Sequence, residues 1–215
     1  MFIARSGNRR AVVEGILIMD SVAALILWTI PAFFLLSLVE WIDDRRGPDK
    51  PRGTFSSRDV AGNWVTYLLN TFFKAFSHYA LPFSAIIVAS ARTPLHLSPT
   101  HWWVWVACLL VTDGGYYWAH RGDHRIRLLW AAHSVHHSST YFNMSTNLRL
   151  PWFHPVSYTV RSLAWLPAAL LGFPTWMIVL LNTAGLVFQI PCHTQRIGKL
   201  WRPYEFVFNT PSHHR

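Results

Sequence analysis

Long apolar runs alternate with short polar segments along this chain. The first three runs are Gly15–Val39, Trp64–Ala91 and His101–Ala119. A helix needs about 20 mainly apolar residues to cross a bilayer, and each run is close to that length. Proline is tolerated inside membrane helices, so Pro31 does not argue against the first span. The pattern therefore predicts three transmembrane helices.

The fourth apolar run, Ser162–Ile190, contains no charged residue. As one straight helix it would be about 43 Å long at 1.5 Å per residue. The hydrocarbon core is only about 30 Å thick, so one helix of this length does not fit it. Proline and glycine also interrupt the run. We predict that Pro155–Ile190 forms a hairpin of two short helices, with its tip at Gly172–Pro174.

The polar segments between these runs differ in charge. Arginine and lysine gather in Ile42–Asn63, His120–Arg149 and His193–Arg215, whereas Arg92–Thr100 has a single base. Cytoplasmic loops of membrane proteins carry an excess of basic residues. The first three segments are therefore predicted to be cytoplasmic and the last to lie outside. Three N-terminal bases do not fit, because an odd number of crossings would place them outside: Arg5, Arg9 and Arg10.

Composition supports a membrane protein. Of 215 residues, 52% are hydrophobic and 13% are charged, against about 25% charged in soluble domains. This excludes a disordered chain, a coiled coil and a disulfide scaffold, and Cys108 and Cys192 are expected to be small buried side chains. The net charge of +9 is scattered between apolar runs, so no nucleic-acid partner is predicted. We predict an all-α, polytopic membrane helical bundle with a cytoplasmic histidine-rich cap, divided at residues 1–112 and 113–215.

Five of the twelve histidines form two motifs just after the third run. His120-Arg-Gly-Asp-His124 is an HxxxH motif, and His133-Ser-Val-His136-His137 is an HxxHH motif. Residues three or four apart share one face of a helix, so each motif can present several imidazoles to one metal ion. Neutral imidazole suits iron, zinc, copper or nickel. The spacing predicts a metal site at the bilayer surface.

Asp113 lies inside the third run, seven residues before His120. An acid within a membrane segment is costly and is a functional candidate by default. We predict that Asp113 accepts a hydrogen bond from a ligand imidazole. The alternative is a hydrogen bond that packs helices together.

Four more histidines lie downstream, and three of them are further candidate ligands: His193, His213 and His214. If they join the same site, an even number of membrane crossings must separate them from the second motif. The predicted hairpin supplies two.

These motifs carry a resemblance to a known family. Together with Phe208-Asn-Thr-Pro-Ser-His-His-Arg215, they resemble the fatty acid hydroxylase / sterol desaturase superfamily of integral membrane di-iron oxygenases with three histidine boxes. Asp113-Gly-Gly-Tyr-Tyr-Trp-Ala-His120-Arg121 looks like the approach to the first box. Cys192-His-Thr-Gln-Arg-Ile-Gly198 and the residues at 209–214 look most like the alkylglycerol monooxygenase-type branch. The resemblance covers 113–215, which is then a fatty acid hydroxylase-type domain.

The resemblance implies which residues bind the metal ions and which residues lie around those ligands. The family's third box reads HxxHH, and here the chain ends as that box begins, so truncation within it is expected. The implied metal ligands are His120, His124, His133, His136, His137, His193, His213 and His214. The implied supporting or substrate-pocket residues are Asn143, Asn147 and Arg149.

The function implied is that of an integral membrane enzyme with its active site on the cytoplasmic side. Two iron ions would use O2 to hydroxylate, or desaturate, a lipid C–H bond in lipid biosynthesis or modification. Electrons would come from an external donor, either a protein or a reduced pterin. The alternatives are a non-catalytic or truncated paralogue, a b-type haem electron carrier, and a zinc hydrolase using Asp123, which lies off the face of its neighbouring histidines.

Overall fold

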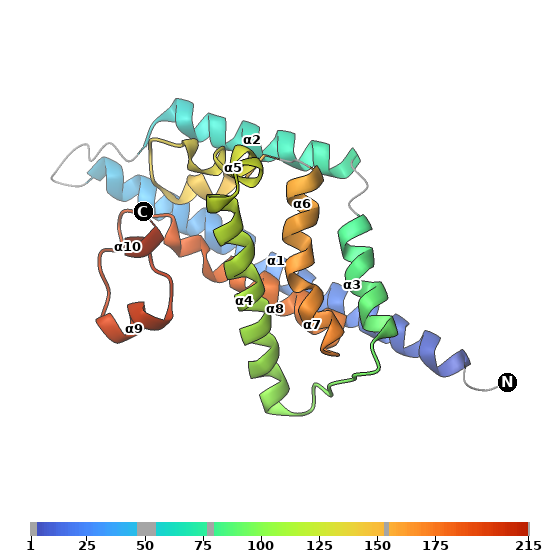
Figure 1. The fold of residues 1–215 in the computed structure, drawn as a ribbon. Coiled ribbons are helices and arrows are strands. Elements are labelled where there is room, and N and C mark those ends of the chain that lie inside the picture. Colours follow the sequence, from blue (N-terminus) through green and yellow to red (C-terminus); the bar gives the residue numbers. More distant parts are fainter. Residues whose placement is uncertain (1–3, 47–54, 77–79, 153–154, 215) are drawn as a thin grey trace.

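Helices are the only regular elements in the described part of the chain. The computed structural model describes residues 4–46, 55–76, 80–152 and 155–214. Within these ranges the predicted all-α class is confirmed. Figure 1 shows long helices crossing one another, with short helices gathered near the C-terminus.

The first helix, α1 (Ala4–Arg46), contains the predicted run Gly15–Val39, with Pro31 inside it. Its apolar side chains face outward: Leu27 and Trp28 are 67% and 76% exposed. Soluble proteins rarely expose so continuous an apolar surface. Together these features fit a helix surrounded by lipid.

The second predicted span is wrong as one continuous helix. The range Trp64–Ala91 is divided between α2 (Ser57–Phe76) and α3 (Ala80–Arg92). Pro82 lies in the first turn of α3, where proline is tolerated. In Figure 1, α2 runs across the top and α3 descends from its end.

The third run forms α4 (Trp102–Arg125), which continues beyond the predicted span into the first histidine motif. The extended backbone of Ile126 then separates α4 from α5 (Arg127–His133). The expected boundary after residue 112 falls inside α4, and the division into two segments stays a prediction.

The predicted chain reversal within the fourth run is confirmed. One arm consists of α6 (Pro155–Ser162), η3 (Leu163–Trp165) and α7 (Leu166–Leu170), and the other of α8 (Thr175–Phe188) and η4 (Ile190–Cys192). Between them Gly172 has φ +86, a conformation that favours glycine.

The loop after α3 closes over this turn. The Leu97 amide donates to the Gly172 carbonyl at 2.9 Å, and the Thr93 hydroxyl donates to the Leu170 carbonyl at 2.7 Å.

The apolar core lies where α3, α4, α7 and α8 meet. Its fully buried members include Val104, Cys108 and Met177. Cys192 is also buried, so both cysteines lie inside as predicted. A Cβ on Gly115 would lie 2.5 Å from the Ala164 carbonyl oxygen, so this glycine lets α4 approach the hairpin closely.

Two described segments are long and apolar enough to cross a membrane, Ala23–Arg46 and Thr175–Cys192. Both belong to helices that pack on each other, α1 and α8. The remaining crossings, and the side on which each loop lies, stay predictions.

Candidate metal centre

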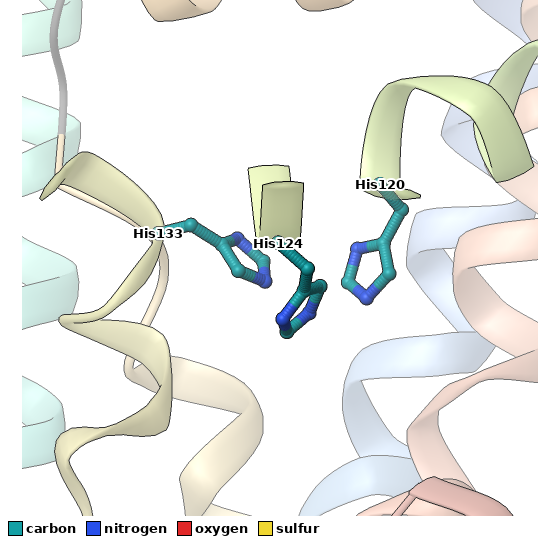
Figure 2. Close-up of side chains that lie close together, drawn as sticks. All are labelled: His120, His124 and His133. Atoms are coloured by element: carbon teal, nitrogen blue, oxygen red, sulfur yellow. The ribbon is translucent and has the colours of Figure 1, made fainter. Parts of the chain in front are cut away.

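Three imidazoles from α4 and α5 form a first histidine group: His120, His124 and His133. Their ring centroids are 4.8 Å apart in every pair, and one ring nitrogen from each lies within 4.8 Å of the others. Figure 2 shows the three rings pointing into one space between the two helices. The HxxxH spacing places the first two on one face of α4, and the turn at Ile126 brings the third across from them.

A second histidine group draws on three distant parts of the chain: His136, His193 and His214. The first lies in η1 (His136–Ser138), the second directly follows η4, and the third ends α10 (Pro211–His214). Nε2 of His193 lies 3.2 Å from Nε2 of His136 and 3.0 Å from Nε2 of His214. The chain reversal at Gly172 is what returns the last two to the second motif.

His137 lies between the two groups. Its Nε2 is 3.1 Å from Nε2 of His133, and its ring centroid is 4.8 Å from that of His124 and 5.0 Å from that of His136. The groups are therefore neighbours. His213 points elsewhere: it is half exposed, and its Nε2 lies 4.0 Å from the Glu205 carboxylate.

Two of the imidazole rings, those of His136 and His133, are oriented by polar groups next to Nδ1. Nδ1 of His136 lies 2.8 Å from the Arg149 carbonyl oxygen, which accepts its proton and leaves Nε2 for the second group. Nδ1 of His133 instead faces a buried ion pair. Arg161 Nη2 lies 2.9 Å from that nitrogen, and Asp123 Oδ2 lies 3.8 Å from it.

The residues expected to support the metal ligands form hydrogen bonds that stabilise the loop after the second motif. Asn143 caps η2 (Met144–Leu148) by accepting from the Ser145 amide. Asn147 donates to the Ile190 carbonyl at 3.1 Å, which joins this loop to the segment before His193.

Arg149 ties the same loop to α2. Its guanidinium donates to Asn63 and pairs with Asp59 at 2.7 Å.

Asp113 is not brought to the histidines. It lies on the exposed side of α4, and no hydrogen bond joins it to an imidazole among the described residues. The carboxylate beside the first group is that of Asp123, which is 1% exposed and accepts from Arg161 Nε at 2.6 Å.

The sequence analysis did not identify two residues that position the site, Arg161 and Glu40. Arg161 had one signal, because it is the last charged residue before the charge-free run. Glu40 had none: it lies near the end of α1, far from every histidine in sequence. Its carboxylate accepts from the Met144 amide at 2.7 Å and from the Thr194 hydroxyl, so it joins the loop after the second motif to the segment that follows His193.

Burial favours the neutral form of six of these imidazoles. Burial lowers the pKa of His120 and His193 from 6.5 to about 3, and that of His136 and His137 to about 4. Burial also lowers the pKa of His133 and His214. Neighbouring imidazoles add to the effect, since two charged rings would repel. Burial raises the pKa of the Asp123 carboxyl, and the Arg161 guanidinium opposes that rise.

A cavity of about 810 Å³ opens from the histidines into the helices. His120, His133, His136, His193 and His214 line one part of it, and Asp123 and Arg161 lie beside them. The rest of the wall is mainly apolar, and includes Phe33, Trp165, Ile178 and Leu186. This space can hold a long apolar molecule with one end against the imidazoles.

The donor set fits two metal ions. Each group offers three imidazole nitrogens, and neutral imidazole binds iron, zinc, copper or nickel. Two neighbouring groups of this kind fit a two-metal site.

Comparisons with known proteins agree with this chemistry. A family model described as fatty acid hydroxylase matches residues 105–215, about half of the chain. The chain is 42% identical over 116 residues to an alkylglycerol monooxygenase of Danio rerio and 40% identical to that of Homo sapiens. Each match covers 53% of this chain and 24% of the relative.

An alkylglycerol monooxygenase of Caenorhabditis elegans is 29% identical over 161 residues, which is 75% of this chain and 31% of that protein. The matched part therefore spans less than a third of each of these relatives. No solved structure matches.

Proposed function

The chain belongs to the fatty acid hydroxylase family, and from this premise we propose that it is a membrane-bound, O2-dependent non-haem iron monooxygenase that hydroxylates a lipid. One observation carries the proposal. Two neighbouring groups of imidazoles lie at one part of a largely apolar cavity of about 810 Å³.

The chain's own residues would provide the ligands and the shape of the site. The first histidine group would hold one iron ion and the second the other, with His137 between them. The metal pair supplies activation of O2 and attack on an unactivated C–H bond, chemistry that no protein side chain provides. The six imidazoles whose pKa burial lowers need not lose a proton to bind a metal at neutral pH.

The cavity wall would orient the substrate. Phe33, Trp165 and Ile178 offer apolar surface along which an alkyl chain can lie. Such a wall binds the chain and keeps bulk water from the reacting carbon. Because the curated relatives bear the name alkylglycerol monooxygenase, a glycerol lipid with an alkyl chain is the first substrate to test.

The reaction also needs electrons from outside the chain. We place their entry on the side of the histidines, which the positive-inside rule makes cytoplasmic. The basic segments there suit an acidic donor protein, and a reduced pterin is the other candidate.

The test is metal analysis together with product formation. The full chain is purified in detergent after expression with iron. About two iron ions per chain, and O2-dependent conversion of an alkylglycerol to a hydroxylated product, are expected. Less than about one iron per chain, or zinc at full occupancy, would contradict the proposal.

Two adjacent histidines give a matched control. His214→Ala removes a ligand of the second histidine group, and iron should fall by about half. His213→Ala removes the neighbouring imidazole, which points toward Glu205, and iron should stay at the wild-type level.

A further inference from the structure

The two histidine groups have different supports behind them. In the second group, Nδ1 of His136 faces a neutral acceptor, the Arg149 carbonyl oxygen at 2.8 Å. In the first group, Nδ1 of His133 faces a charged pair, Arg161 and Asp123. His133 is 2% exposed and Asp123 is 1% exposed, so water screens this arrangement little.

The two carboxylate oxygens of Asp123 differ in their hydrogen bonds. Asp123 Oδ2 accepts from both Nε and Nη2 of Arg161, whereas Oδ1 is buried and has no hydrogen-bond partner among the described residues. A buried acceptor without a partner is costly, about 1–3 kcal/mol. Arg161 Nη2 is also directed at His133 Nδ1, which can accept only while that nitrogen carries no proton.

Binding of a metal ion would change which atoms around His133 must donate and accept hydrogen bonds. The Nε2 of His133 faces the other imidazoles, since it lies 3.1 Å from that of His137. Once Nε2 binds a cation, the proton of the neutral ring is on Nδ1, which must then donate. Arginine has no acceptor, so the guanidinium cannot take this proton. The nearest acceptor is Asp123 Oδ2, 3.8 Å away.

We propose that Asp123 and Arg161 are positioning residues that make the first metal position, at His120, His124 and His133, bind a divalent cation more tightly than the second. Oδ2 of Asp123 then accepts a hydrogen bond from the Nδ1–H of His133. The Arg161 guanidinium donates instead to Oδ1 of Asp123. A carboxylate behind a ligand imidazole makes the ring a stronger donor, whereas the carbonyl behind His136 brings no charge. This inference rests on the proposed function for the identity of the site.

The experiment is a metal titration that needs neither O2 nor lipid. The full chain is purified in detergent, stripped with a chelator and titrated with Co²⁺ alone, whose absorption reports each site. Two phases of equal amplitude are expected, the tighter about 10–100-fold stronger than the other. A single phase with two equivalent sites would overturn the proposal.

Ligand variants assign the phases. His124→Ala should remove the tight phase and leave the weak one, because it belongs to the first histidine group. His214→Ala should do the opposite. If His214→Ala removes the tight phase, the order of affinities is reversed and the proposal is wrong.

The positioning pair is tested by a double variant, Asp123→Asn with Arg161→Gln, which removes both charges and leaves no buried charge unpaired. The tight phase should weaken by about 10–100-fold and merge with the second. Asp113→Asn is the control. Asp113 lies on the exposed side of α4, and no hydrogen bond between it and an imidazole is described. It should leave both phases unchanged.

The outcomes separate this inference from the proposed function. If the chain shows two unequal sites but carries no iron and makes no product, the proposed function fails and the positioning role stands. If the chain carries iron and hydroxylates lipid but the double variant keeps the tight phase, the positioning role fails alone. Should the double variant fold poorly, the wild-type titration and the two ligand variants still decide.

Discussion

A single carboxylate secures the part of the chain that carries His214. Glu205 Oε1 accepts from the Leu200 amide at 2.9 Å and from the hydroxyls of Thr210 and Ser212 at 3.0 and 2.5 Å. These hydrogen bonds lower the pKa of Glu205 from 4.5 to about 2, because they favour its ionised form. The carboxylate thus closes the loop from α9 (Arg202–Val207) to α10.

Replacing Glu205 with Gln should loosen this loop in a pH-dependent way. Its pKa is lowered on folding, so its contribution to stability is present above the unfolded value of 4.5 and is lost as pH falls toward 2. At neutral pH the variant should melt below the wild type, and the gap should close as the solution is acidified. Circular dichroism melts across this pH range measure it.

The control for this experiment is Asp113→Asn. Asp113 lies on the exposed side of α4 and should melt like the wild type at every pH. A gap between wild type and Glu205→Gln that stays constant down to pH 2 would contradict the stated role of the carboxylate.

At this scale the sequence revealed the histidines but not their supports. Spacing alone placed His120 with His124, because helical periodicity brings such residues together. Asp123 and Arg161 are 38 residues apart, and no local pattern joins them. His213 and His214 are neighbours with the same chemistry, and only the fold of α10 shows which of them faces the site.

Among the elements, α1 has a role beyond its apolar surface. Glu40, near its end, is 4% exposed and accepts hydrogen bonds from Met144 and Thr194. One of these belongs to the loop after the second motif and the other follows His193 directly. A helix distant in sequence from every ligand therefore holds in place the loop after the second motif and the segment that carries His193.

Glu40→Gln should destabilise both loops. A glutamine side chain has only one acceptor oxygen, so its amide NH2 would face one of the two donors. The cost is about 1–3 kcal/mol for a buried group of this kind. Hydrogen exchange should rise at residues 143–148 and 193–196. Asp20→Asn, an exposed change on the same helix, should leave exchange there unaltered, and equal exchange in all three proteins would count against this role.

Helices and turns were predicted correctly where a hydrophobic pattern, or proline and glycine within an apolar run, determined the structure. The reversal at Gly172 followed from Pro and Gly in a run too long for one crossing. The division between α2 and α3 was missed, because average apolarity continues from one helix into the next. The histidine-bearing α5 and η1 are too short for periodicity to detect.

On the scale of the whole molecule, the first histidine motif and the loop between α3 and α4 lie at opposite ends of α4. In Figure 1 this loop lies at the lower end of α4, whereas α5 lies by its upper end. The Arg92–Thr100 loop packs on the Gly172 turn, as the Leu97 amide shows. This separation agrees with the charge pattern, which places basic segments near the histidines and few bases in that loop.

Membrane sidedness can be read with a maleimide that does not cross membranes. Cys108 and Cys192 are buried, so they give little background. His96→Cys lies in the loop after α3 and Lys199→Cys before α9, and both positions are exposed. In intact cells the first should react, and the second only after permeabilisation, because basic segments stay in the cytoplasm. If both react before permeabilisation, the histidines lie outside and an electron donor in the cytoplasm cannot reach them.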